Sequence, residues 1–253
     1  MILTLIGLIT GLVLGLTGAG GALIAIPLFL NGLQVSLNEA TFLSLIVVMI
    51  ASGINYLGTH RGEGPKADYK IVIGLFLSSF LGTGIALQIK PFVGDLITAF
   101  LLALISLYGL WSVWKKRSTP KEGFEVKRFW PTLLAGIAFG ALTTLTGLGG
   151  GVLIIPLLIT VFHLSYEEAL PSSLLLIFLI SLSSFVLQFF KRGSEGMKRG
   201  DILFLFIGTL LASVLVKKLT AKIPAKWNDL GRRVVFTLVV LYSFIAIGQK
   251  VLM

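Results

Sequence analysis

Charged residues are confined to short segments between long uncharged stretches, and this distribution restricts the chain to a membrane protein. The sequence contains 21 Lys and Arg and 11 Asp and Glu, so 13% of its residues are charged, about half the share of a soluble domain. The main uncharged stretches are residues 1–38, 40–59, 71–89, 96–114, 129–166, 169–190, 202–216 and 234–249. Crossing a bilayer core takes about 20 helical residues, so most of these stretches are long enough to span it.

These stretches predict an all-α polytopic membrane protein. A transmembrane β-barrel would need segments of about 10 residues in which apolar and polar side chains alternate. The run from Leu174 to Leu179 is apolar at every position, which does not fit that alternation. The stretches 1–38 and 129–166 are nearly twice as long as one span, and both are interrupted by glycine.

The net charge of +10 follows from basic residues in the loops beside the predicted spans, where Lys and Arg favour the cytoplasmic side. We therefore expect a lipid bilayer and no nucleic acid as the partner of these charges. The chain has no cysteine, which excludes disulfides, thiolate metal sites and cysteine catalysis. The span centres carry no ionisable residue, so the sequence indicates no catalytic residue, metal site or cofactor.

A shift of 129 positions superimposes the two longest stretches and the span that follows each. Chance similarity would explain shared Gly and Leu, but not Thr, Pro, Ser and Glu matched in order. The sequence thus predicts two homologous halves of about four hydrophobic segments each, residues 1–114 and 130–253, joined by a basic cytoplasmic connector at 115–129. The aligned identities are Gly7 with Gly136, Gly11 with Gly140, Thr17 with Thr146, Gly18 with Gly147, Gly20 with Gly149, Gly21 with Gly150, Pro27 with Pro156, Ser36 with Ser165, Glu39 with Glu168, Ser44 with Ser173, Ser52 with Ser181 and, after two short insertions, Pro91 with Pro224.

The first stretch of each half contains a glycine cluster that is expected to break its helix, because each helical Gly costs about 1 kcal/mol relative to Ala. Unwound backbone at membrane depth is tolerated only where it is buried in protein or lines a watery cavity. The half-helix that follows would direct free N–H groups and its positive dipole end into that cavity, which favours an anion. The predicted substrate-binding residues are Thr17, Gly18, Gly20 and Gly21 in the first half, Thr146, Gly147, Gly149, Gly150 and Gly151 in the second, and the paired Ser44 and Ser173 of the next span.

Two alternatives apply to the small polar residues. Gly7, Gly11, Gly136 and Gly140 are spaced as in a helix-packing face, and close packing is the favoured interpretation for these four. Any single serine of a span can instead form a helix-to-helix hydrogen bond. The paired Thr-Gly-x-Gly-Gly clusters do not form a packing stripe, which favours a ligand site there.

Charge leaves two topologies open. If every stretch spans once, the halves are parallel; if the two broken stretches are re-entrant, the halves are inverted and the tips of the breaks face each other near the midplane. Both arrangements place at least twice as many Lys and Arg in the cytoplasm as outside.

The duplicated, basic, cysteine-free chain, with Thr-Gly-x-Gly-Gly-x and a downstream Pro in each half, resembles the sulfite exporter TauE/SafE family, the toluene-sulfonate-uptake type of permease. The resemblance covers residues 2–251, and its most specific part runs from Thr146 to Gly151 with Pro156. The first copy departs from it, because Ala22 stands where the second has Gly151.

This resemblance implies a secondary transporter, not an enzyme, that moves sulfite, sulfoacetate or another small sulfur-containing oxyanion across the bacterial inner membrane. The substrate within this class, its direction, the coupling ion and homo-oligomerisation stay open. The alternatives are an anion channel, in which flux would not saturate, and a membrane scaffold or assembly factor, for which the twin breaks would have no purpose.

Overall fold

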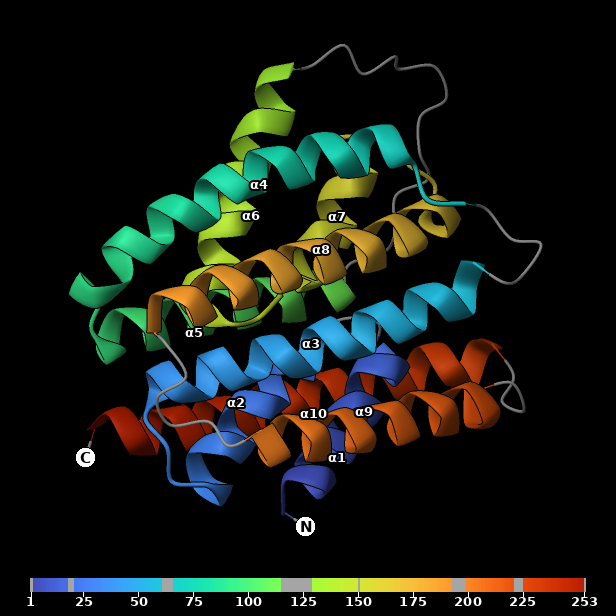
Figure 1. The fold of residues 1–253 in the computed structure, drawn as a ribbon. Helices are drawn as coiled ribbons and strands as arrows, with labels where there is room; N and C mark the ends of the chain where they lie inside the picture. The colour runs from blue at the N-terminus through green and yellow to red at the C-terminus, as the bar shows by residue number, and fades with distance from the viewer. Residues whose placement is uncertain are drawn as a thin grey trace.

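The computed structural model describes residues 2–17, 21–60, 66–114, 129–149, 151–192, 199–220 and 225–252. These residues form helices joined by short loops, with no strand among them (Figure 1). The helices of the first half are α1 (Ile2–Thr17), α2 (Gly21–Gly32), α3 (Leu37–His60), α4 (Tyr69–Ile89), a 3₁₀ turn at Lys90–Phe92 and α5 (Asp95–Trp114). The second half contains α6 (Phe129–Thr146), α7 (Gly151–Thr160), α8 (Tyr166–Arg192), α9 (Arg199–Thr220) and α10 (Ala225–Leu252).

The outer surface of the helices is apolar, as a lipid-facing surface must be. Among the described residues, four helices are long and apolar enough to cross a membrane, at 37–59, 69–92, 95–112 and 166–191. Large apolar side chains of α4, α5 and α10 point outward, including Leu77, Phe100 and Leu238. The predicted all-α multi-pass membrane protein is thereby confirmed.

The helices α3 and α8 begin with the same cap. The Ser36 and Ser165 backbone N–H groups donate to the carboxylates of Glu39 (3.2 Å) and Glu168 (3.0 Å), and each Glu N–H donates back to the serine hydroxyl. These reciprocal bonds are capping boxes, which satisfy the free N–H groups at a helix start. Both acidic residues therefore have a local role at a span end.

α3 and α8 lie side by side across the middle of the molecule and run in opposite directions (Figure 1). Phe42, near the start of α3, stacks on Phe185 near the end of α8, with ring centroids 5.4 Å apart. Gly53, further along α3, lies against Phe178, which precedes Phe185 on α8. The residue numbers fall on one helix as they rise on the other, so the pair is antiparallel.

α1 and α9 run parallel, and two glycines let their backbones touch. A Cβ on Gly7 would lie 2.7 Å from the carbonyl oxygen of Leu205, and one on Gly11 would lie 2.7 Å from Cβ of Ala212. Real Cβ atoms do not approach other atoms so closely. The predicted packing role of both glycines is confirmed, and it matches the small-residue contacts of membrane helices.

α4 and α6 form the matching parallel pair. A Cβ on Gly136 would lie 2.6 Å from the carbonyl oxygen of Leu75, and one on Gly140 would overlap the carbonyl oxygen of Ser79. The packing prediction is therefore confirmed for these two glycines as well.

The last two helices of each predicted half pack on the first two helices of the other half. α9 and α10 pack on α1 and α2, whereas α4 and α5 pack on α6 and α7. Gln34 and His163, which the repeat aligns, both have a φ of 53° after the short helices α2 and α7. The duplication and its boundaries stay predictions, which these reciprocal features support. Residues 115–128 of the predicted connector lie outside the described residues.

Candidate functional site

The second predicted break lies between α6 and α7, where two glycines have left-handed backbone. α6 ends at Thr146, α7 begins at Gly151, and Gly147 and Gly149 have φ angles of 70° and 65°. Only glycine adopts these angles without a steric penalty from Cβ. In the first half α1 ends at Thr17 and α2 begins at Gly21. The predicted site residues Gly18, Gly20 and Gly150 lie outside the described residues, and of Thr17 and Gly21 only the helical backbone is described.

The break between α6 and α7 lies against the middle of both central spans. A Cβ on Gly149 would meet Val48 of α3, and it would lie 3.2 Å from Oγ of Ser181 and 3.3 Å from Cγ2 of Ile177 on α8. Val48, Ile177 and Ser181 are close to the midpoints of α3 and α8. The 10 residues of α7 extend about 15 Å, roughly half of a bilayer core. The unwound backbone thus lies at about mid-depth in the membrane.

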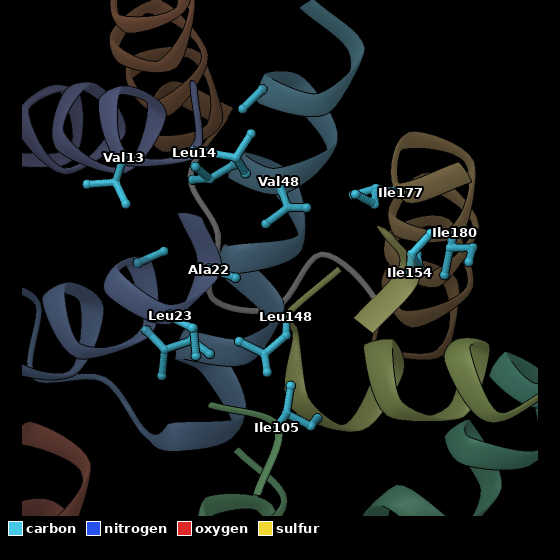
Figure 2. Close-up of a cluster of buried hydrophobic side chains, with 14 of the residues drawn as sticks. Val13, Leu14, Ala22, Leu23, Val48, Ile105, Leu148, Ile154, Ile177 and Ile180 are labelled. Carbon is cyan, nitrogen blue, oxygen red and sulfur yellow. The ribbon is translucent and has the colours of Figure 1, made fainter. Parts of the chain in front are cut away.

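The residues around the break are packed without exposure to solvent. Leu148, between the two left-handed glycines, is 4% exposed and belongs to the same hydrophobic cluster as Ala22 and Leu23 of α2 (Figure 2). Val48, Ile154 and Ile177 complete this part of the core. The two broken stretches therefore share one core, and a ligand could reach the break only after helices move apart.

Ser44 and Thr146, two of the predicted hydroxyl ligands, form hydrogen bonds with the backbone at the break. The Ser44 hydroxyl, from α3, lies 2.9 Å from the carbonyl oxygen of Gly147 and 2.7 Å from that of Thr41, so its one proton is shared between them. The Thr146 hydroxyl donates to the Leu142 carbonyl at 2.6 Å and accepts the Leu148 N–H at 3.4 Å. Both residues position the backbone of the break, and their role as ligands stays a prediction.

The other members of the predicted site lie at different places around the break. Ser173 is fully buried and donates to the Leu170 carbonyl of its own helix at 2.8 Å. Gly151 is the first residue of α7 and is buried beside the break. Ser173 is thus bonded locally, whereas Gly151 places the N-terminal end of α7 at the left-handed turn.

Three buried polar atoms among the described residues have no hydrogen-bond partner, and all belong to the second half. They are Oγ1 of Thr143, Oγ of Ser181 and Nε2 of Gln188. A buried polar group without a partner is unfavourable, by about 1–3 kcal/mol, so native proteins rarely keep one without a reason. The hydroxyl of Ser181 is one of the groups closest to Gly149, so this unused group lies at the break itself.

A row of polar side chains continues from Ser181 along α8. Ser184 contacts the hydroxyls of Thr144 at 3.1 Å and Thr83 at 3.4 Å. One turn further, Oε1 of Gln188 accepts a hydrogen bond of 2.7 Å from Nζ of Lys90. We call Ser181, Ser184 and Gln188 the α8 polar row. Their spacing of three and four residues places them on one face of α8.

The described residues hold no group of three or more His, Asp or Glu side chains that could bind a metal ion. A cavity of about 660 Å³ lies between α5 and α10, and no residue of the break lines it. Its lining is apolar, with Phe100, Phe244 and Ile247 among its residues, which suits a hydrocarbon chain better than an oxyanion.

The comparisons with known proteins identify the group to which this architecture belongs. A sequence model described as "Sulfite exporter TauE/SafE" matches residues 3–247, nearly the whole chain. The chain belongs to the sulfite exporter TauE/SafE family. Two relatives, each named "Probable membrane transporter protein", come from Xylella fastidiosa strains 9a5c and Temecula1. They are 29% and 27% identical to this TauE/SafE chain, over 67% of its length and 66% of theirs. No solved structure is significantly similar to it.

Lys90, which contacts the α8 polar row of this TauE/SafE protein, is not among the predicted site residues. Lys90 follows a predicted span directly and precedes Pro91, so its position is typical of a loop residue that anchors a span end. The contacts of its side chain with α6 and α8 could not be predicted from the sequence. The only signal was its isolation, because Lys90 is the single basic residue between two long uncharged stretches.

Proposed function

We propose that the chain is a secondary transporter for a small oxyanion such as sulfite, sulfoacetate or another sulfonate, in the inner membrane of a bacterium. The observation that carries this proposal is the break at Gly147–Gly149, which lies at mid-depth beside the unpartnered hydroxyl of Ser181. An oxyanion accepts hydrogen bonds and carries negative charge, so it suits the N-terminal end of α7 and a free hydroxyl donor. The TauE/SafE family and the names of the relatives support transport as the activity.

The inverted arrangement of the two halves is part of the proposal. Under the predicted repeat, α8 is the counterpart of α3, and parallel repeats would require these two helices to run in the same direction. Their antiparallel packing supports the inverted form, with re-entrant broken stretches. The short lengths of α2 and α7, 12 and 10 residues, support it further, because neither could cross the bilayer alone.

Alternating access follows from this arrangement. Because the described structure encloses the break, it corresponds to an occluded form. Rocking of the helices around α3 against those around α8 would open the break to one side of the membrane at a time. Binding by neutral donors at the break is expected to be weak and reversible, as release requires.

Uptake of labelled sulfite and sulfoacetate into proteoliposomes tests the proposal. Flux that saturates with substrate concentration supports it, and flux that rises linearly with concentration indicates a channel. No flux of any oxyanion contradicts it.

Cysteine labelling tests the inverted topology. Because the chain contains no cysteine, Gly193→Cys and Lys222→Cys would each carry a single thiol. We expect an impermeant thiol reagent added to intact cells to label the cysteine at position 193 but not the one at position 222. The opposite result, an accessible cysteine at position 222 and a protected one at position 193, would contradict the inverted form.

Ser181→Ala tests the site at little structural cost. Removing an unpartnered buried hydroxyl should leave the unfolding temperature in detergent unchanged or slightly higher, whereas losing one donor to the anion should raise the KM for sulfite about tenfold. Ser183→Ala is the matched control, because Ser183 is buried on the same helix but already donates to the Ile180 carbonyl. Equal KM values for the two variants would exclude Ser181 as a ligand.

A further inference from the structure

The side chain of Lys90 turns into the protein from the lipid-facing end of α4. Its neighbours Ile89 and Phe92 are 47% and 86% exposed, as expected for residues that face lipid. The Lys90 ammonium instead donates to the carbonyl oxygen of Thr144 at 3.1 Å and to Oε1 of Gln188 at 2.7 Å. A cation is thereby held over the last turn of α6, close to the break.

Gln188 presents an unused donor beside this cation. The side chain is 2% exposed, and its Nε2 has no hydrogen-bond partner among the described residues. An ammonium group can only donate, so Oε1 must face Lys90 and the amide N–H groups must point elsewhere. Gln188 therefore presents a buried, unsatisfied N–H donor beside a positive charge, and an anion is the kind of ligand that suits both groups.

The α8 polar row connects this place to the break. Gln188 and Ser181 are seven residues apart on one face of α8, a distance of about 10 Å along the helix. Ser184 lies between them and contacts the Thr144 hydroxyl at 3.1 Å. An oxyanion that leaves Lys90 would therefore meet successive hydroxyl groups on its way to Gly149.

The predicted repeat supplies no basic residue at the position that corresponds to Lys90. The predicted repeat aligns the α8 polar row with Ser52, Asn55 and Thr59 of α3, which are also polar. However, the alignment of Pro91 with Pro224 pairs Lys90 with Ile223, which carries no charge. The repeat alignment therefore gives Lys90 no basic equivalent at the opposite membrane face, and Ile223 itself lies outside the residues that the structure describes.

We propose that Lys90 and Gln188 form an outer anion-binding site, which captures the oxyanion at the membrane face where α4 and α8 end and passes it along the α8 polar row to the break. The inference rests on the proposed function, because the site would take the same substrate. In the inverted topology this face is the external one. The substrate would then meet the charge of Lys90 when it binds from outside, whereas the position that the repeat pairs with Lys90 on the cytoplasmic side is the uncharged Ile223.

Lys90→Cys allows a test in which the charge is removed and then restored. Aminoethylation of the new thiol with 2-bromoethylamine creates a thioether side chain of nearly the length and charge of lysine, whereas iodoacetamide adds a neutral group. We expect Lys90→Cys to raise the KM for labelled sulfite about tenfold or more. Aminoethylation should return the KM to within about threefold of wild type, and iodoacetamide should not.

Lys191→Cys is the matched control, because Lys191 is an exposed lysine near the end of α8 that donates to the Leu87 carbonyl and is not part of the α8 polar row. It should transport sulfite with the wild-type KM.

A wild-type KM in Lys90→Cys, or equal rescue by the neutral and the cationic adducts, would overturn the outer site. If Lys90→Cys fails to fold, Gln188→Leu removes the other member of the site, and a wild-type KM in that variant would likewise overturn the outer site. If the wild-type protein itself transports neither sulfite nor sulfoacetate, the proposed function fails as well. Failure of the outer site alone is therefore distinguished by normal transport in the wild-type protein.

Discussion

Gly149→Val is expected to abolish oxyanion flux in proteoliposomes. At a φ of 65° an L-residue costs roughly 1–2 kcal/mol, and a β-branched one more. The added Cβ would overlap Val48 and lie 3.2 Å from Oγ of Ser181, so the branched side chain would fill the space beside the free hydroxyl. The initial rate of labelled sulfite uptake, normalised to reconstituted protein, measures the effect.

Gly84→Val is the control for this substitution. Gly84 lies in α4, and a Cβ there would have no atom within 4 Å. It should therefore transport at nearly the wild-type rate. The double variant Gly149→Ala, Val48→Ala removes the overlap and leaves the backbone strain, so it separates a blocked site from a distorted turn. Flux in Gly149→Val equal to that in Gly84→Val would contradict a binding role for the break.

Gly140→Leu is expected to destabilise the folded protein strongly. A Cβ on Gly140 would overlap the backbone carbonyl of Ser79, and backbone cannot move aside as a flexible side chain can. Separating α4 from α6 would remove contacts along the whole pair, at a cost of about 3 kcal/mol or more. We expect a lower yield of monodisperse protein in detergent and an unfolding temperature several degrees lower, measured by tryptophan fluorescence.

Gly84→Leu again provides the comparison, because it adds the same side chain to a helix of the same pair at an open position. Its yield and unfolding temperature should match those of the wild-type protein. Wild-type stability in Gly140→Leu would show that the close approach of α4 and α6 is not required.

The packing glycines illustrate what could be predicted from local patterns. Gly136 and Gly140 are four residues apart in an apolar stretch, which in a membrane helix indicates a face for close contact. The pattern identified the contact surface but not its partner, which is α4 of the other half. Which helix becomes the partner depends on the shape and hydrogen bonds of the whole assembly, so the spacing of glycines in one helix does not predict it.

For Ser44, the sequence indicated a position near the break but not which groups its hydroxyl contacts. The repeat singled out this residue, and it does lie at the break, 2.9 Å from the Gly147 carbonyl. Its proton is directed at backbone carbonyls, which makes it a support of the turn. Whether a hydroxyl binds backbone or ligand depends on which acceptors lie within about 3 Å, and only the packing of α3 on the break determines that.

The membrane environment, the helical class and the position of the break before Gly151 could be predicted from the sequence, because these depend on hydrophobicity and backbone preference along a continuous segment. The antiparallel packing of α3 on α8 and the contact of Lys90 with Gln188 became visible only when the helices were packed together. Both contacts join residues that are far apart in the sequence, and the charge counts fitted either topology. Local physics defines the helices, whereas the groups that meet between them depend on how all the helices pack at once.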